Sequence, residues 1–271
     1  MTDAKQEKNI REDGQGAKMP FTQHLIELRK RLIVCLIAVA VGFGICYYFS
    51  EPIFRVMLRP LLKVMPEGNH LIYTGLPEAF FTYLKVGLWG GVILALPVIF
   101  HQLWGFVAPG LYRTERRYLI PFVIFSTVLF LIGGFFGYFI VFPFGFSFFV
   151  GFSNDTIQVM PSVKEYFSLA LKLLFGFGII FELPLIMVFL GRMGIVNHQM
   201  LARGRKFAIV LVFVVAAILT PPDWVSQVLM ALPLMVLYEL SIILVRFTAK
   251  KRAEKKAAAL AAAEEVVPQE D

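Results

Sequence analysis

Charged residues and cysteines are scarce in this sequence. Charged residues fill 17% of the 271 positions, whereas hydrophobic residues fill 58%. A soluble domain of this length could not bury so much apolar surface, so a lipid bilayer must cover part of it. The two cysteines, Cys35 and Cys46, lie about 16 Å apart along one expected helix, which is too far for a disulfide bond. They indicate nothing about the redox compartment.

Several catalytic and binding motifs are also missing. The sequence has no glycine-rich phosphate loop ending in Gly-Lys-Ser or Gly-Lys-Thr, and its four histidines fall in separate segments. ATP hydrolysis and metal chemistry are therefore disfavoured. Ser126 and Ser168 fall at membrane depth, but His101 lies near the end of an apolar run, which disfavours an intramembrane serine protease. We expect no enzyme activity, no cofactor and no metal.

Six long apolar stretches dominate the chain. A transmembrane helix needs about 20 mostly apolar residues. The candidate stretches are 32–49, 79–104, 118–142, 166–190, 207–219 and 225–245. This pattern predicts an all-α integral membrane protein with six transmembrane helices and no separate soluble domain.

Basic residues are distributed unequally between the two sides of these stretches. Twenty of the 26 lysines and arginines lie in the N-terminal segment, the second and fourth loops and the C-terminal tail, against four on the other side. Because basic residues in short loops stay on the cytoplasmic side, we predict that both termini are cytoplasmic. The net charge of +7 then describes membrane flanks, and no nucleic-acid partner is expected.

The two ends of the chain differ from its apolar part. We predict a disordered extension over residues 1–19, a transmembrane domain over 20–247 and a solvated, partly helical cytoplasmic tail over 248–271. Apolar residues recur at helical spacing just before the first span, namely Phe21, Leu25, Leu28 and Leu32. This spacing predicts an amphipathic helix lying at the cytoplasmic surface.

Three prolines stand in similar short patterns, one in each helix that is expected to run from the outside to the inside. They are Pro97, Pro184 and Pro233. Proline removes a helix hydrogen bond and can bend the helix, so kinks here would give the bundle a concave wall. Proline is also common in membrane helices, which leaves an internal repeat open.

The last two apolar stretches form a short hairpin with polar residues along it. The fifth stretch has thirteen residues, about 20 Å of helix against a hydrocarbon core of about 30 Å, and the sixth is interrupted by Glu239. Either the bilayer thins beside this hairpin or flanking polar residues reach the interface. Asp223 is an expected N-cap of the last helix, with Gln227 one turn further on.

One acidic residue falls near the centre of an apolar stretch. Glu182 stands beside Pro184 in the fourth stretch, where a carboxylate is unfavourable unless it faces protein or water. Glu182 is either a hydrogen-bonded structural residue or a polar site for a partner helix or substrate inside the bilayer.

Two further acids lie in basic neighbourhoods near the expected cytoplasmic surface. Glu27 is followed by Arg29, Lys30 and Arg31, and Glu115 is flanked by arginines that begin with Arg113. Local pairing, such as Glu27 with Arg31, would contribute a few tenths of a kcal/mol. Alternatively, the two carboxylates accept guanidinium groups from another molecule, in a bidentate geometry that lysine cannot reproduce.

Taken together, these segments resemble the TatC family, the multi-spanning subunit of the twin-arginine protein translocase. The resemblance rests on HLIELRKR at 24–31, WGFVAPGLY at 104–112 followed by ERR at 115–117, FELP at 181–184 and LTPPD at 219–223. It covers about residues 20–247, in the order and with the six-helix layout of the family.

The resemblance implies a function and a set of site residues. It implies a receptor in the bacterial inner membrane that binds twin-arginine signal peptides and exports folded proteins, using the proton-motive force, within a multi-copy complex with TatA-type and TatB-type single-span partners. It implies signal-peptide contacts at Glu27, Phe106 and Glu115, with Arg113 beside them. It also implies a membrane-embedded polar position at Glu182. Partner contacts are expected in the last hairpin, at Asp223, Gln227 and Glu239.

The residues alone also allow other classes. A small-solute transporter would show six helices, kinks and a buried acid, but it would not need paired surface acids. A purely structural membrane scaffold is a third alternative, in which charge reversal at Glu115 would change neither peptide binding nor solute flux. Charge reversal at Glu115 separates these alternatives, since only a receptor would lose binding of a twin-arginine peptide.

Overall fold

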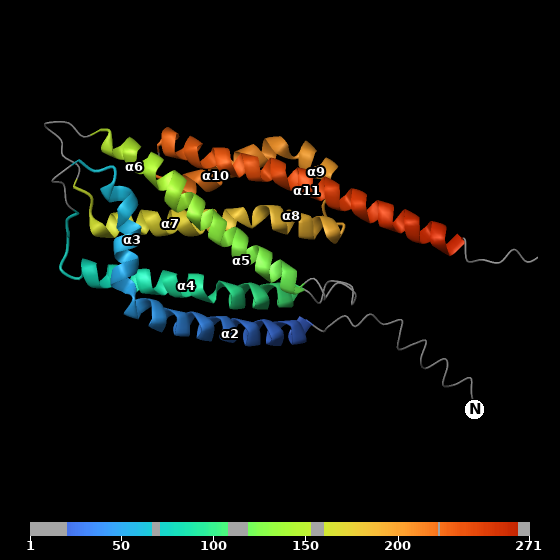
Figure 1. Cartoon of the computed structure of the whole chain (residues 1–271), viewed down its shortest axis with the longest axis horizontal. Coiled ribbons are helices and arrows are strands. Elements are labelled where there is room, and N and C mark those ends of the chain that lie inside the picture. The colour runs from blue at the N-terminus through green and yellow to red at the C-terminus, as the bar shows by residue number, and fades with distance from the viewer. Residues whose placement is uncertain (1–20, 67–70, 108–118, 153–159, 222, 265–271) are drawn as a thin grey trace, which may run out of the picture.

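The computed structural model describes residues 21–66, 71–107, 119–152, 160–221 and 223–264. Long helices run side by side, and one shorter helix, α3 (Ser50–Leu62), crosses them at one end (Figure 1). We call this end of the bundle the α3 end, and we call the opposite end, where the helix α2 (Phe21–Tyr48) begins, the Phe21 end. The one β-bridge among the described residues pairs Ile72 with Ser162 at the α3 end.

The helices follow the order expected from the apolar stretches. After α2 and α3 come α4 (Glu78–Val107), α5 (Leu119–Phe136), the π-helix η3 (Gly137–Val141), α6 (Phe142–Val150), α7 (Val163–Phe181), α8 (Leu183–Arg192), α9 (His198–Arg203), α10 (Arg205–Leu219) and α11 (Trp224–Glu264). Several of these are continuous in space, so the bundle contains fewer rods than named elements (Figure 1).

Five helical stretches among the described residues are long and apolar enough to cross a membrane. They are Gln23–Tyr48, Glu78–Val107, Leu119–Val150, Val163–Arg192 and Trp224–Lys250. The all-helical membrane fold is therefore confirmed. The helix α10 has 15 residues, about 22 Å of length, and falls short of this set. Six crossings and cytoplasmic termini stay predictions.

The helix predicted before the first span is present, but it is not separate from that span. The helix α2 runs without interruption for 28 residues from Phe21, so Leu25 and Leu28 belong to the same rod as the first span. No glycine or proline occurs between residues 21 and 41, and leucine, arginine and lysine are good helix formers. The basic residues at 29–31 therefore do not end the helix.

Two stretches interpreted as loops are partly helical. The segment after the first span contains α3, whose buried side is formed by Met57, Pro60 and Leu61. The third span continues beyond residue 142 through η3 and α6. Pro143 lies in the first turn of α6, directly after η3, and because the rod is continuous here its missing N–H leaves one carbonyl of the preceding turn without a helix partner.

Only the first helix of the last hairpin, α10, is short. The helix α11 continues through Glu239 to Glu264, so the polar interruption does not end it, and the tail predicted as partly helical extends the same helix. Arg205, the first residue of α10, donates from Nε to Glu239 Oε1 at 2.7 Å and from Nη2 to Oε2 at 2.9 Å. The guanidinium group of Arg205 thus pairs with both oxygens of the Glu239 carboxylate, which explains why the helix tolerates an acid at this position.

The three prolines have different surroundings. Pro97 and Pro233 lie inside the continuous helices α4 and α11, and bending there stays a prediction. Pro184 follows an interruption at Glu182, which separates α7 from α8.

The first two spans approach each other through glycines. A Cβ atom on Gly42 would lie 2.5 Å from the carbonyl oxygen of Gly91, and one on Gly91 would lie 2.4 Å from the backbone nitrogen of Phe43. Small residues allow this kind of backbone contact between membrane helices. The contact fixes α2 against α4, and these two helices carry the first part of the candidate site.

Candidate functional site

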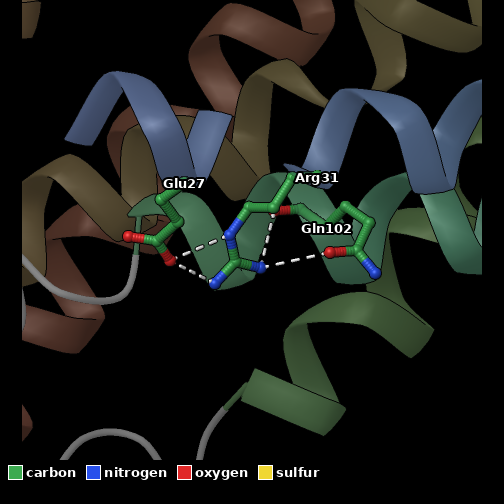
Figure 2. Close-up of polar contacts among 3 residues, drawn as sticks. All are labelled: Glu27, Arg31 and Gln102. Atoms are coloured by element: carbon green, nitrogen blue, oxygen red, sulfur yellow. Dashed lines mark hydrogen bonds and ion pairs between the residues drawn. The ribbon is translucent and has the colours of Figure 1, made fainter. Parts of the chain in front are cut away.

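The Phe21 end of α2 and α4 carries a polar cluster around Arg31 (Figure 2). Arg31 donates to Glu27 Oε1 from Nε at 3.0 Å and from Nη2 at 2.6 Å. Its third nitrogen, Nη1, donates to the backbone oxygen and to Oε1 of Gln102 at 3.4 and 3.3 Å. The guanidinium group therefore joins an acid on its own helix to a polar residue on α4.

Among the described residues, only one of the two carboxylate oxygens of Glu27 accepts hydrogen bonds. Both contacts from Arg31 reach Oε1, and among the described residues Glu27 Oε2 accepts no hydrogen bond. About a quarter of each side chain is exposed, 26% for Glu27 and 23% for Arg31. A carboxylate can accept a bidentate guanidinium group, so this site can take another donor without first losing Arg31.

Aromatic and glycine residues fix the sides of this cluster. The rings of His24 and Phe106 stack with centroids 4.2 Å apart, which joins the ends of α2 and α4. A Cβ atom on Gly105 would lie 2.4 Å from Arg31 Nη1. Glycine at this position thus leaves the space that the guanidinium group occupies.

The second predicted acid cannot be placed in this cluster. Glu115 and Arg113 belong to the segment 108–118, which lies outside the described residues. It joins the end of α4 to the start of α5, both of which lie at the Phe21 end (Figure 1).

Glu182 lies at the interruption between α7 and α8 and is buried, with 6% of its surface exposed. Its Oε1 has no hydrogen-bond partner among the described residues, and its polar neighbour is the side chain of Ser126 on α5. The hydroxyl oxygen of Ser126 accepts a hydrogen bond from Trp104 Nε1 at 2.8 Å. Polar side chains therefore connect the α7–α8 interruption to α4.

A groove of about 600 Å³ lies beside this interruption, between α5, α8 and α11. Phe181 and Pro184, on either side of Glu182, contribute to its lining, and exposed apolar side chains such as Phe125 form its walls. Arg192 lines it as well, with its guanidinium carbon 5.6 Å from the ring centre of Phe122. The groove is thus apolar with a basic residue where α8 ends.

The polar residues at the start of α11 have structural contacts. Asp223 Oδ1 accepts from the backbone nitrogen of Ser226 at 2.7 Å, so the predicted N-cap is confirmed. The Ser226 hydroxyl also donates to Asp223. Gln227 Nε2 donates to the backbone oxygen of Phe213 at 3.1 Å and joins α11 to α10.

Glu78, which no sequence motif singles out, is buried at the α3 end. Its Oε2 accepts from the backbone nitrogens of Thr74 and Gly75 and from the Thr74 hydroxyl at 2.6–3.2 Å. Its Oε1 accepts from the hydroxyl of Ser162 at 2.7 Å and the backbone nitrogen of Lys164 at 2.6 Å. An acid directly before a predicted span was the available signal, but two of its partners, Ser162 and Lys164, lie more than 80 residues away.

Comparisons with known proteins point to one family. The sequence model of the Sec-independent protein translocase protein (TatC) matches residues 23–233. The protein of that name from Desulforapulum autotrophicum is 57% identical over 235 residues, which is 87% of each chain. The one from Escherichia coli K12 is 41% identical over 228 residues, covering 84% of this chain and 88% of its own.

A solved structure gives the same result. The crystal structure of the twin-arginine translocase receptor TatC superimposes with a TM-score of 0.76 at 42% sequence identity. It covers 83% of this chain and 99% of the solved chain. The region that the family model matches, residues 23–233, includes the Glu27 cluster, the α7–α8 interruption and the start of α11. The chain therefore belongs to the TatC family of Sec-independent protein translocase proteins.

Proposed function

We propose that this chain is the receptor subunit that binds twin-arginine signal peptides in a bacterial inner membrane. In this proposal it crosses the membrane six times with both termini in the cytoplasm, so the Phe21 end faces the cytoplasm where signal peptides arrive. It acts with TatA-type and TatB-type single-span subunits in a multi-copy complex. The complex exports folded proteins using the proton-motive force, and the chain itself is not an enzyme.

The observation that carries this proposal is that Glu27 Oε2 accepts no hydrogen bond among the described residues, while Oε1 accepts from Arg31. One arginine of the signal peptide donates to Oε2, while Arg31 keeps Oε1 or turns fully to Gln102, which it already contacts. Arginine fits because its planar fork can donate two hydrogen bonds to one carboxylate, whereas lysine offers a single point charge. This difference predicts that arginine pairs bind more tightly than lysine pairs.

The second arginine of the signal is assigned to Glu115, with Arg113 setting the local charge. Phe106 is held by its stacking with His24 and supplies an apolar contact next to Glu27. The two acids then belong to α2, which begins at the Phe21 end, and to the segment that joins α4 to α5.

Partner helices are assigned to the other polar positions. Glu182 offers a buried carboxyl group beside the groove between α5, α8 and α11, where a polar side chain of a transmembrane helix could pair with it. Asp223 and Gln227 at the start of α11, together with Glu239 further along it, are assigned to partner contacts along the last hairpin. Bends at Pro97, Pro184 and Pro233 give the receiving surface its concave shape. Residues 1–19 and 248–271 are extensions of the domain formed by residues 20–247.

Photocrosslinking tests the signal-peptide site. A photoreactive amino acid at position 106 or 115 is exposed to a signal peptide with an Arg-Arg pair, with a Lys-Lys peptide as control. We expect strong labelling by Arg-Arg only. Glu27→Gln should reduce it by about tenfold or more, because a hydrogen bond to a charged group contributes about 1.5–3 kcal/mol.

The chain supplies a matched control for the Glu27 variant. Glu51 is also an acid paired with an arginine four residues later, at 2.5 Å, but it lies beyond the opposite end of α2. Glu51→Gln should label like the unchanged protein. Equal labelling by the two peptides, or full labelling in Glu27→Gln, would remove the basis for the proposal.

The short α10 contributes a second step to the proposal, in which thinned bilayer beside it lowers the barrier to passage. Inserting four leucines lengthens α10 by about 6 Å. Export should fall while signal-peptide crosslinking stays unchanged. Unchanged export would contradict the thinning step and leave the receptor site intact.

A further inference from the structure

A second groove lies on another side of the bundle, between α3, α4, α5 and η3. Its volume is about 310 Å³, roughly that of ten water molecules. All of its accessible lining is apolar, and it includes Val56 on α3 and Phe135 and Phe139 on the third span. These three side chains are 44%, 60% and 65% exposed, so the groove opens toward the lipid.

Proline and tyrosine hold the two walls of this groove at a fixed distance. Pro60 has no N–H, and it therefore leaves the carbonyl oxygen of Val56 without its helix partner. The hydroxyl of Tyr138 in η3 donates to that oxygen. On the buried side of α3, the hydroxyl of Tyr166 donates to the next carbonyl oxygen, that of Met57. The helix α3 is thus fastened to the third and fourth spans at the groove.

A row of basic side chains stands over the groove. Arg55 and Arg59 on α3 and Lys63 at its C-cap follow each other at intervals of four residues, all exposed, and this spacing places them on one side of the helix. Arg55 pairs with Glu51. Among the described residues Arg59 and Lys63 make no ion pair. Arg59 and Lys63 follow the groove-lining Val56 by three and seven residues, and this spacing places them on the side of α3 that faces the groove.

We propose that this arrangement binds an anionic glycerophospholipid, with its phosphate at Arg59 and Lys63 and part of an acyl chain in the groove. The helix α3 lies across one end of the spanning helices (Figure 1), and the ends of spanning helices are where lipid head groups meet the acyl region. A cationic row directly above a fully apolar groove matches a ligand with one anionic group and an alkyl chain. A soluble phosphate would use the cations but leave the groove without a ligand. The proposal is independent of the signal-peptide site, which lies at the opposite end of the bundle.

Native mass spectrometry of the full-length protein in detergent tests this site. The probes are phosphatidylglycerol and phosphatidylcholine with identical acyl chains, and glycerol 3-phosphate as the head group alone. We expect phosphatidylglycerol to be retained in preference to phosphatidylcholine, and glycerol 3-phosphate not to be retained. The double change Arg59→Gln and Lys63→Gln should lower phosphatidylglycerol retention by roughly 25-fold, about fivefold for each basic residue. Lys164→Gln, at an exposed basic residue of the same end, should change nothing.

The groove itself is tested by filling it. Gly134 lines the groove, and the nearest atom to a Cβ there is Leu174 Cγ at 3.8 Å, so Gly134→Leu can place its side chain in the groove without a backbone clash. It should reduce retention of both phospholipids. Gly44→Leu is the matched control, because a Cβ there meets nothing within 4 Å. Equal retention of the two phospholipids by the unchanged protein overturns the proposal. So does unchanged phosphatidylglycerol retention in the double variant, whatever Gly134→Leu does.

Discussion

Substitution of Gly91 by alanine should separate α2 from α4. The added Cβ would lie 2.4 Å from the backbone nitrogen and 2.7 Å from the Cα of Phe43. Both are backbone atoms, so no side-chain rotation can relieve the contact. Non-bonded atoms pack best about 3.5–4.0 Å apart, and the two helices would therefore have to separate by about 1 Å. Overpacking of this kind costs about 1–3 kcal/mol.

The effect can be measured with a thiol-reactive dye during heating. Cys46 packs against Gly90 in the same interface, and its thiol is free and partly covered, so labelling should increase as the helices separate. With a shift of about 2–4 °C per kcal/mol, the transition should fall by roughly 2–12 °C. Gly44→Ala is the control, since its Cβ meets no atom within 4 Å and alanine favours the helix by about 0.5–1 kcal/mol. Equal transitions in the two variants would refute the close-contact argument.

Three other substitutions test contacts described above. Ser126→Ala leaves the buried indole N–H of Trp104 without its acceptor and should destabilise the fold by about 1–3 kcal/mol, measured as a lower thermal transition together with a change in tryptophan fluorescence; an unchanged transition would show that the hydrogen bond adds nothing. In Glu78→Gln, an amide NH₂ group, which cannot accept a hydrogen bond, replaces one of the two accepting carboxylate oxygens. The loops at the α3 end should therefore become more sensitive to limited proteolysis. Unchanged cleavage would contradict this. Gly105→Ala should displace the guanidinium group of Arg31. The affinity for a twin-arginine peptide should therefore change, and an unchanged affinity would contradict this.

Hydropathy predicted the spans well because membrane helices are selected by length and apolar character alone. It failed where polar residues stand inside helices. The helix α3 was read as a loop because Arg55, Arg59 and Pro60 interrupt its apolar residues, although Met57 and Leu61 have helical spacing. The continuation of α11 through Glu239 depends on Arg205, which lies 34 residues away. A sequence pattern does not show that these two residues meet.

The candidate site was predictable in its charged residues only. Glu27 and Glu182 stood out because an acid in a basic segment, or at membrane depth, requires an explanation. Gln102 is uncharged and carries no such signal, and its role comes from a contact with Arg31 across 71 positions. Glu78 likewise acquires its importance from Ser162, 84 positions further on. Such contacts depend on how the spans pack, which local patterns do not encode.

The hydrogen bonds around Glu78 fix one end of the helix α4 within the bundle. They hold the start of α4 to the loop that leads into α7, whereas the far end of α4 is held at Arg31 by a partly exposed cluster. The distance from Glu78 to Phe106 along α4 is about 42 Å. A rotation of α4 by about 1° around its fastened end would therefore move Phe106 by about 0.7 Å, by lever geometry on that helix length. Because α2 is fixed against α4 at Gly91, such a tilt would carry the Arg31 cluster with it while the α3 end keeps its structure.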